Sequence, residues 1–206
     1  MKYTHIFFDV DGTIMDSEKA AVLSFVKTLS ELNIPIPEKE ELVKIMGSST
    51  TETMNNLNLS DPESAVLLWQ KNALAAFAGC KPFEDVIDTL HALRDMGYRL
   101  GIVTSRAKAE IENDLSFNSY LPLFDIGVFS DEVSHIKPSP EPLLKAMEKA
   151  EVTADSCLYI GDSKCDFECA SAANMDFMLA LWGARNADSI PCDIRLSSPR
   201  DIMKYL

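Results

Sequence analysis

Two pairs of aspartates in this sequence have the residue types and the spacing needed to bind a metal ion or to transfer protons. Asp9 and Asp11 lie in the segment 9–13, where an apolar run ends in a glycine turn. An unpaired acid inside an apolar run is costly, so we expect a metal ion to bind Asp9. Asp162 and Asp166 lie four residues apart after a second apolar run. The alternatives are a local turn for the first pair and N-terminal helix capping for the second.

Hydroxyl groups and a lysine follow two further apolar segments. Thr104 ends the segment 99–104 and Ser105 follows it, while Lys137 directly precedes a turn with two prolines. The prolines stiffen the backbone around the lysine. Taken alone, the hydroxyls are equally typical of helix caps and the lysine of a solvated surface. Together with the acidic pairs, these groups supply a nucleophile, a proton carrier, an anion clamp and the ligands of a Mg²⁺ ion.

The elements that must position these residues alternate between short apolar strands and amphipathic helices. We expect strands at 5–10, 99–104, 125–130, 157–160, 176–181 and 194–196. We expect helices between them at 84–96, 107–115, 140–150 and 165–173. This alternation predicts an α/β fold, a Rossmann-like, mostly parallel sheet with helices on both faces. Ligands of such sheets bind beyond the carboxyl ends of the strands, where the reactive residues are expected.

A helical segment interrupts this alternation after the first strand. Ser17 is the expected N-cap of a first helix, and helical patterns continue over about 38–46, 50–57 and 61–77, with no convincing strand among them. The sequence therefore predicts an α/β core of residues 1–15 and 82–206, with an all-helical insertion of residues 16–81.

Composition and charge exclude several classes of partner. The 206 residues carry a net charge of −13, which disfavours binding to nucleic acid or to anionic membranes. No apolar run approaches the ~20 residues that cross a bilayer, and the N-terminus does not resemble a signal peptide. The 5 cysteines contain no C-x-x-C pair, as suits a reducing compartment. We expect a cytoplasmic protein, either a monomer or a small homo-oligomer.

In their order and spacing, these motifs resemble those of the haloacid dehalogenase (HAD) superfamily of phosphotransferases. The segment 9–13 resembles the first motif, Thr104-Ser105 the second, Lys137-Pro138 the third and the segment 161–166 the fourth. The resemblance covers essentially the whole chain, and the inserted helices resemble the small α-helical cap of the family. One departure is Asn174, where related sequences commonly have glycine. Asparagine is the next best residue for a left-handed helix cap, so we expect the same backbone there.

The resemblance implies a role for each acid. Asp9 would be the nucleophile that forms an aspartyl-phosphate. Asp11 would protonate the leaving oxygen and then deprotonate the attacking water. Mg²⁺ would be the cofactor, held by Asp9, Asp162 and the backbone carbonyl of Asp11, an all-oxygen set that suits a hard ion. Asp166 would hold a metal-bound water or Lys137.

The resemblance also implies contacts with the substrate. The groups expected at the transferred phosphoryl oxygens are Gly12, Thr104, Ser105 and Lys137. The insertion would close over them as a lid, hinged about residues 15–17 and 79–82. Gly47 and Ser48, at a break between inserted helices, are the expected substrate loop; an ordinary turn is the alternative. Arg106 would reach an acidic group of the substrate, or else lie solvated in the first turn of a helix.

The function implied is a Mg²⁺-dependent phosphatase that hydrolyses a small phosphate monoester through an aspartyl-phosphate. Dehalogenases of the superfamily lack the second acid of the first motif, so Asp11 argues against that reaction. Two alternatives stay open. One is a phosphomutase like β-phosphoglucomutase, and the other is a phosphate-binding protein without catalysis. The expected partner is a small phosphorylated metabolite.

Overall fold

The computed structural model describes residues 2–38, 42, 53–55, 57 and 59–206. Six strands form one sheet in the order β3-β2-β1-β4-β5-β6, and every strand pair is parallel. The strands are β1 (His5–Phe8), β2 (Arg99–Val103), β3 (Ile126–Val128), β4 (Cys157–Gly161), β5 (Asp176–Ala180) and β6 (Arg195–Leu196). The predicted Rossmann-like α/β fold is confirmed, and the predicted strand ends differ by one or two residues.

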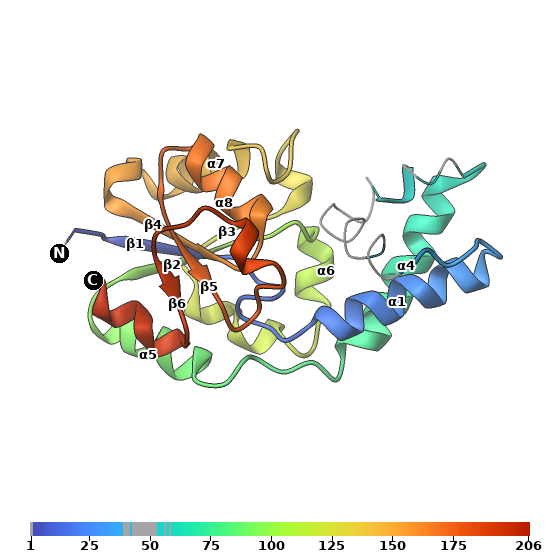
Figure 1. Ribbon diagram of the computed structural model, residues 1–206, viewed down its shortest axis with the longest axis horizontal. Helices are drawn as coiled ribbons and strands as arrows, with labels where there is room; N and C mark the ends of the chain where they lie inside the picture. The colour runs from blue at the N-terminus through green and yellow to red at the C-terminus, as the bar shows by residue number, and fades with distance from the viewer. Residues whose placement is uncertain (1, 39–41, 43–52, 56, 58) are drawn as a thin grey trace.

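Helices cover both faces of this sheet (Figure 1). They are α5 (Val86–Asp95), α6 (Lys108–Glu112), α7 (Glu141–Ala150) and α8 (Lys164–Ala172). Short 3₁₀ helices are η1 (Asn118–Leu123), η2 (Ser130–Glu132), η3 (Ala154–Ser156), η4 (Ala187–Ser189) and η5 (Pro199–Lys204). Side chains of β1 alternate between the two faces: Ile6 and Phe8 pack with α5, whereas Phe7 packs with α7 and α8. β1 is therefore a buried central strand, as its apolar run predicts.

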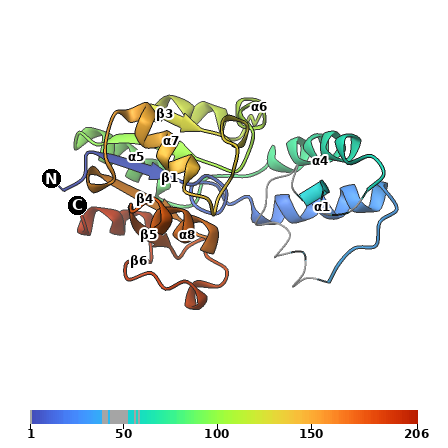
Figure 2. The same ribbon diagram turned by 90° about the horizontal axis from the view of Figure 1, so that it is seen from above.

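Two long helices, α1 (Glu18–Glu31) and α4 (Pro62–Phe77), lie beyond one end of the sheet, opposite both chain termini (Figures 1 and 2). They pack against each other around Phe25, Leu29 and Trp69, an apolar cluster separate from those of the sheet. The indole N–H of Trp69 donates a buried hydrogen bond to Ser24 at 3.0 Å. Among the described residues of 16–81 there is no strand. The helices predicted over 38–46 and 50–57 lie mostly outside the described residues.

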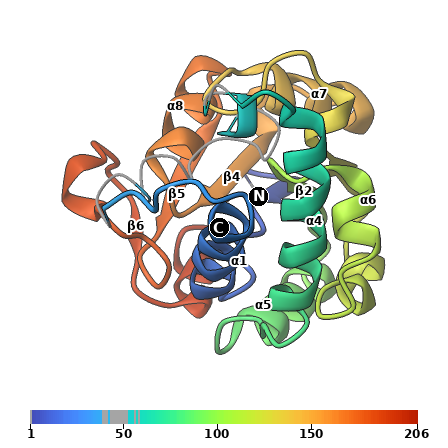
Figure 3. The ribbon, with the colours of Figure 1, turned by 90° about the vertical axis from the view of Figure 1, so that its right-hand side faces the viewer.

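The chain enters and leaves this helical part at adjacent positions. Met15 forms an isolated β-bridge with Pro82, and the Asp16 N–H donates to the Lys81 carbonyl at 2.9 Å. We propose that these connections bound an α/β core of 1–15 and 82–206 and a cap of 16–81. Figure 3, viewed from the cap side, shows α1 and α4 in front of the sheet.

Two turns that follow helices of the core adopt a left-handed backbone, and the sequence predicts the one at Asn174. Gly97, after α5, has φ +93°, and Asn174, after α8, has φ +53°. Asparagine thus replaces the glycine of related sequences without changing the turn. No helix in the described ranges combines the length and apolar character needed to cross a membrane.

Candidate active site

The sheet order brings three sequence motifs to the same edge. Asp9 follows β1, Thr104 follows β2 and Asp162 follows β4. Since β1 pairs with β2 on one side and with β4 on the other, these three positions are neighbours. They lie at the carboxyl ends of the strands, where ligands bind in open parallel sheets.

Lys137 lies at the centre of this group and is buried, with a side chain 6% exposed. Its ammonium donates to Oδ1 of Asp9 at 2.6 Å and to Oδ1 of Asp166 at 2.6 Å. Burial alone would lower the pKa of Lys137, but the charges of Asp166 and Asp9 outweigh it and raise the pKa well above its usual value. The lysine is therefore a charged group fixed beside Asp9, and the alternative of a solvated surface lysine is wrong.

Asp166 is positioned by several donors. Its Oδ2 accepts hydrogen bonds from the Ser163 hydroxyl at 2.5 Å and from the Ser163 N–H at 3.1 Å. Burial would raise the pKa of Asp166, yet Lys137 and these donors lower it below its usual value. Asp166 is thus an ionised partner of Lys137. It also caps the start of α8, so the expected contact with Lys137 and the alternative of helix capping both apply to it.

Tyr159, within β4, is a further member of the site and is not among the residues that the sequence predicts for it. Its hydroxyl lies 3.1 Å from Nζ of Lys137, 2.8 Å from Oδ1 of Asp166 and 3.2 Å from the carbonyl oxygen of Val103. Its side chain is fully buried, which raises the pKa of the phenol. The one signal available in the sequence was a hydroxyl inside the otherwise apolar run of β4.

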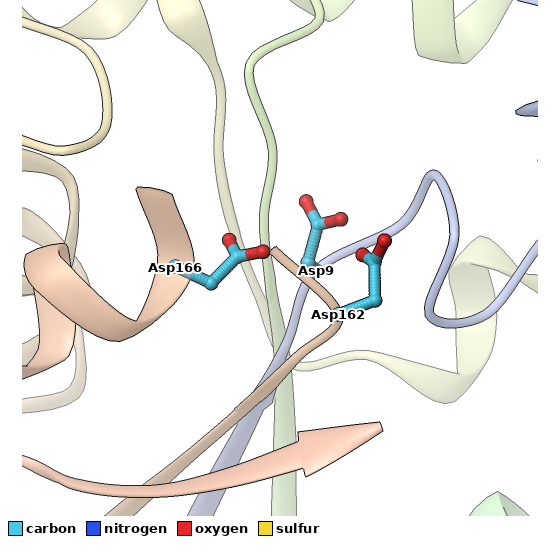
Figure 4. Close-up of side chains that lie close together, drawn as sticks. All are labelled: Asp9, Asp162 and Asp166. Carbon is cyan, nitrogen blue, oxygen red and sulfur yellow. The ribbon is translucent and has the colours of Figure 1, made fainter. Parts of the chain in front are cut away.

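Asp9, Asp162 and Asp166 each place a carboxylate oxygen within 4.8 Å of the others. Figure 4 shows the Asp9 side chain between the other two. Burial, followed by the charge of Asp166, raises the pKa of Asp162 to about 7. Oδ1 of Asp162 accepts a hydrogen bond from the Thr13 hydroxyl at 3.1 Å. One lysine faces three carboxylates here, so this oxygen-rich donor set fits a hard divalent cation such as Mg²⁺.

The position of the Asp162 side chain requires a glycine at position 12. Its φ is +89°, and a Cβ at this position would fall 2.4 Å from Oδ2 of Asp162. A second glycine, Gly183, packs against the Gly12 carbonyl so closely that a Cβ would lie 1.7 Å from its oxygen. The loop after β1 is therefore closely packed between Asp162 and the loop after β5.

Asp11 points to a different set of partners from Asp9. Its Oδ1 accepts a hydrogen bond from the Ser17 hydroxyl at 2.7 Å and lies 3.9 Å from Nη1 of Arg106. The sequence predicts Ser17 as the N-cap of the first helix, and the helix does begin at Glu18. However, the Ser17 side chain makes no cap hydrogen bond and contacts Asp11 instead.

Arg106 is largely shielded from solvent, with a side chain 12% exposed. Its guanidinium donates to Asp114 at 2.8 Å and to the Glu110 carbonyl at 2.8 Å, and it lies 4.7 Å from the centre of the Phe77 ring. The alternative of a solvated first-turn residue is therefore wrong. Arg106 connects the site to the end of α4.

A cavity of about 530 Å³ lies between the sheet edge and the cap helices. The predicted residues on its floor are Asp9, Asp11, Gly12, Thr104, Ser105, Lys137, Asp162 and Asp166. Its cap wall is mostly apolar and includes Trp69, Ala73 and Phe77 of α4. Gly47 and Ser48, the predicted substrate loop, lie outside the described residues. Everything else that the sequence predicts for the site thus lies around one cavity, Arg106 included.

Comparison with known proteins agrees with this geometry. Residues 6–180 match the family model described as haloacid dehalogenase-like hydrolase. The phosphoglycolate phosphatase of Aquifex aeolicus is 31% identical over 204 residues, covering 98% of this chain and 95% of that protein. The pyrophosphatase PpaX of Bacillus mycoides is 28% identical over 210 residues, covering 100% and 98%.

A solved structure has the same architecture over its whole length. The crystal structure of a Lactobacillus plantarum protein assigned as a phosphoglycolate phosphatase superposes with a TM-score of 0.88. It is 28% identical to this chain, and the match covers 100% of both. These matches confirm the predicted enzyme class, a phosphatase. The chain belongs to the haloacid dehalogenase-like hydrolase family.

Proposed function

We propose that this protein is a Mg²⁺-dependent phosphatase that hydrolyses a small phosphate monoester through an aspartyl-phosphate on Asp9. The observation that carries this proposal is the placement of Asp9. It is buried on the floor of the cavity, with Lys137 on one carboxylate oxygen and Asp162 beside it. The charged ammonium of Lys137 favours the ionised form of Asp9 that a nucleophile needs and opposes the rise in pKa that burial causes.

Asp9, Asp162 and the backbone carbonyl of Asp11 are the groups that would hold the metal. When bound, Mg²⁺ neutralises the phosphoryl oxygens and the carboxylates around them. Without a cation, burial and the charges of Asp166 and Asp162 raise the pKa of Asp9 above its usual value, against the effect of Lys137. The floor is thus short of positive charge by itself, which supports a cation requirement.

In the first step, an oxygen of Asp9 attacks phosphorus as the bond to the leaving oxygen breaks. Lys137 donates to Oδ1 of Asp9, so the other oxygen is available for attack. Thr104, Ser105 and Lys137 line the cavity, and the Thr104 hydroxyl, the Ser105 amide and the Lys137 ammonium would bind the phosphoryl oxygens. Asp11 supplies the proton that the leaving oxygen needs.

In the second step, Asp11 takes a proton from a water molecule, which attacks phosphorus and releases Asp9 and inorganic phosphate. Asp11 lies two residues after Asp9 and is oriented by Ser17. The same carboxyl therefore serves first as an acid and then as a base. The apolar cap wall restricts the access of bulk water to the aspartyl-phosphate.

The volume of the cavity and the names of similar proteins indicate which substrates to test. A cavity of about 530 Å³ suits a small metabolite. Relatives that span the whole chain are named phosphoglycolate phosphatase and pyrophosphatase. We propose a small phosphorylated metabolite as the substrate and would test both compounds together with sugar phosphates.

The experiment is a phosphate-release assay over such a panel, with Mg²⁺ and with EDTA. We expect Mg²⁺-dependent release that stops with EDTA and that Asp9→Asn reduces by at least about 10³-fold, as when a nucleophile is removed. Activity that persists in EDTA, or full activity of Asp9→Asn, would contradict the mechanism. Turnover that requires a sugar bisphosphate activator would favour a phosphomutase. No turnover, with tight phosphate binding, would favour a non-catalytic protein.

A further inference from the structure

Among the described residues, four cationic side chains line the cavity, and three of them have evident partners. Lys137 is bound to Asp9 and Asp166. Arg106 is bound to Asp114 and to a backbone carbonyl. Lys164 lies 3.4 Å from Glu168 and is largely exposed. The fourth cation is Arg185.

Arg185 uses only part of its hydrogen-bonding capacity. Its Nε lies 2.9 Å from Oε1 of Glu18, in a pair whose side chains are 29% and 46% exposed. Within the described residues, no hydrogen bond is made by either terminal Nη group. Arginine presents five N–H donors in a planar fork, so most of the fork is available to a ligand in the cavity.

The loop that carries Arg185 is fixed to the loop of the nucleophile. The Trp182 indole N–H donates to the Thr13 carbonyl at 2.8 Å, and Gly183 packs against the Gly12 carbonyl. Ile190, further along the same loop, is buried in a small apolar cluster. Arg185 therefore has a defined position relative to the phosphate site, and little ordering is needed when it binds.

We propose that Arg185 binds a second anionic group of the substrate, a carboxylate or a second phosphate, and that this group displaces Glu18. The proposal rests on the proposed phosphatase function and adds the substrate class to it. Carboxylate and phosphate oxygens match the guanidinium fork in two-point hydrogen bonds. A half-exposed ion pair contributes little, so a ligand oxygen can replace Glu18.

Glu18 should increase the preference for substrates that carry a second anionic group. A substrate without the second anion leaves the pair between Glu18 and Arg185 intact, and its neutral end then faces a charged pair that it cannot replace. Glu18 is the first residue of α1, so the pair also joins the cap to the loop after β5. Binding of a second anion exchanges this link for a contact through the substrate.

The test compares phosphoglycolate with 2-hydroxyethyl phosphate, which has the same length but a neutral end, and uses pyrophosphate as a third substrate. We expect the wild type to prefer phosphoglycolate or pyrophosphate over 2-hydroxyethyl phosphate in kcat/KM. Arg185→Gln should reduce that preference by about tenfold or more, the effect of one lost charged contact. Arg185→Lys should fall between the two, because it keeps the charge without the fork.

Arg200→Gln is the matched control, since Arg200 pairs with Asp85 on the surface and does not line the cavity. It should leave the preference unchanged. The anionic substrate that loses more in Arg185→Gln identifies the second group as carboxylate or phosphate. An equal loss for charged and neutral substrates, or no loss at all, would overturn the assignment while leaving the phosphatase function intact.

Binding gives an independent measurement. Calorimetric titration of phosphoglycolate into the wild type and Arg185→Gln, in Mg²⁺, should show weaker binding by the variant, also by about tenfold. If the wild type hydrolyses none of the substrates, the phosphatase proposal fails, and the titration still decides the role of Arg185. Equal dissociation constants, with unchanged melting temperature, would then contradict it.

Discussion

The hydroxyl of Ser17 donates a hydrogen bond of 2.7 Å to Oδ1 of Asp11. Ser17 immediately precedes α1, whereas Asp11 belongs to the loop after β1. The bond therefore runs from the start of a cap helix to the residue proposed as acid and base. It fixes the carboxyl that must give and then take a proton.

We expect Ser17→Ala to lower kcat by about tenfold with little change in KM, because the carboxyl loses the donor that orients it. Ser17→Thr keeps the hydroxyl and should recover most of the activity. Steady-state kinetics on any turned-over substrate measures both variants. Equal kcat for Ser17→Ala and the wild type would show that the bond has no role in turnover.

Tyr159→Phe should destabilise the protein and slow turnover, because its hydroxyl contacts both Lys137 and Asp166 in a buried place. A lost buried hydrogen bond costs about 1–2 kcal/mol, to be measured by urea unfolding. Tyr98→Phe is the control, since Tyr98 is also buried but its hydroxyl makes no hydrogen bond with the described residues. If the two variants are equally stable, the Tyr159 contacts contribute nothing.

Gly12→Ala should abolish Mg²⁺-dependent activity, because its Cβ would collide with Asp162. Gly97→Ala is the control, because it introduces the same backbone strain without a collision. Gly97 has a similar φ of +93°, but nothing lies within 4 Å of its added Cβ. We expect both variants to lose about 1 kcal/mol or more of stability, and Gly12→Ala alone to lose activity. An active Gly12→Ala enzyme would mean that Asp162 can move without consequence.

The stabilisation that Mg²⁺ gives should depend on pH through Asp162. Without metal, its pKa is raised from 3.8 to about 7, so the folded protein holds a proton that the unfolded chain releases over this interval. The contribution of Asp162 to stability therefore falls as pH rises from about 4 to 7. Mg²⁺ must displace this proton at low pH but not at high pH.

We therefore expect Mg²⁺ to raise the melting temperature more at pH 8 than at pH 5.5, as measured by calorimetry at fixed ionic strength. Asp162→Asn has no titrating carboxyl at this position and should show a smaller shift at both pH values. A shift in the wild type that is larger at pH 5.5 would contradict the assignment of Asp162 as a ligand.

Much of the fold and the location of the site could be predicted from local patterns. The strands ending at Asp9, Thr104 and Asp162 were each marked by an apolar run, and parallel topology alone places their ends at one edge. The left-handed turn at Asn174 followed from residue chemistry. These features depend on neighbouring residues or on sheet topology, so a sequence reveals them.

The partners of the site residues depend on contacts between distant segments. Ser17 carried the local signature of a helix cap, but its hydroxyl donates to a carboxylate six residues earlier and accepts no hydrogen bond from the first turn of α1. Arg106 had the sequence context of an exposed helix start, and only the fold places Asp114 and Phe77 around it. The local signal of Tyr159 was limited to a hydroxyl within an apolar run, and Arg185 lacked any local signal of its role. The roles of all these residues stay predictions until the variants are measured.

The bridge between Met15 and Pro82 has a consequence for how such a protein can diversify. The entropy cost of closing a segment whose two ends meet rises only slowly with its length, by about 0.6 kcal/mol for each doubling. Helices grafted between Asp16 and Lys81 would leave the strands and their register undisturbed, because the cap has its own apolar cluster. The reactive floor can thus be inherited unchanged while the enclosing helices are exchanged, so selectivity and chemistry can evolve on separate parts of one chain.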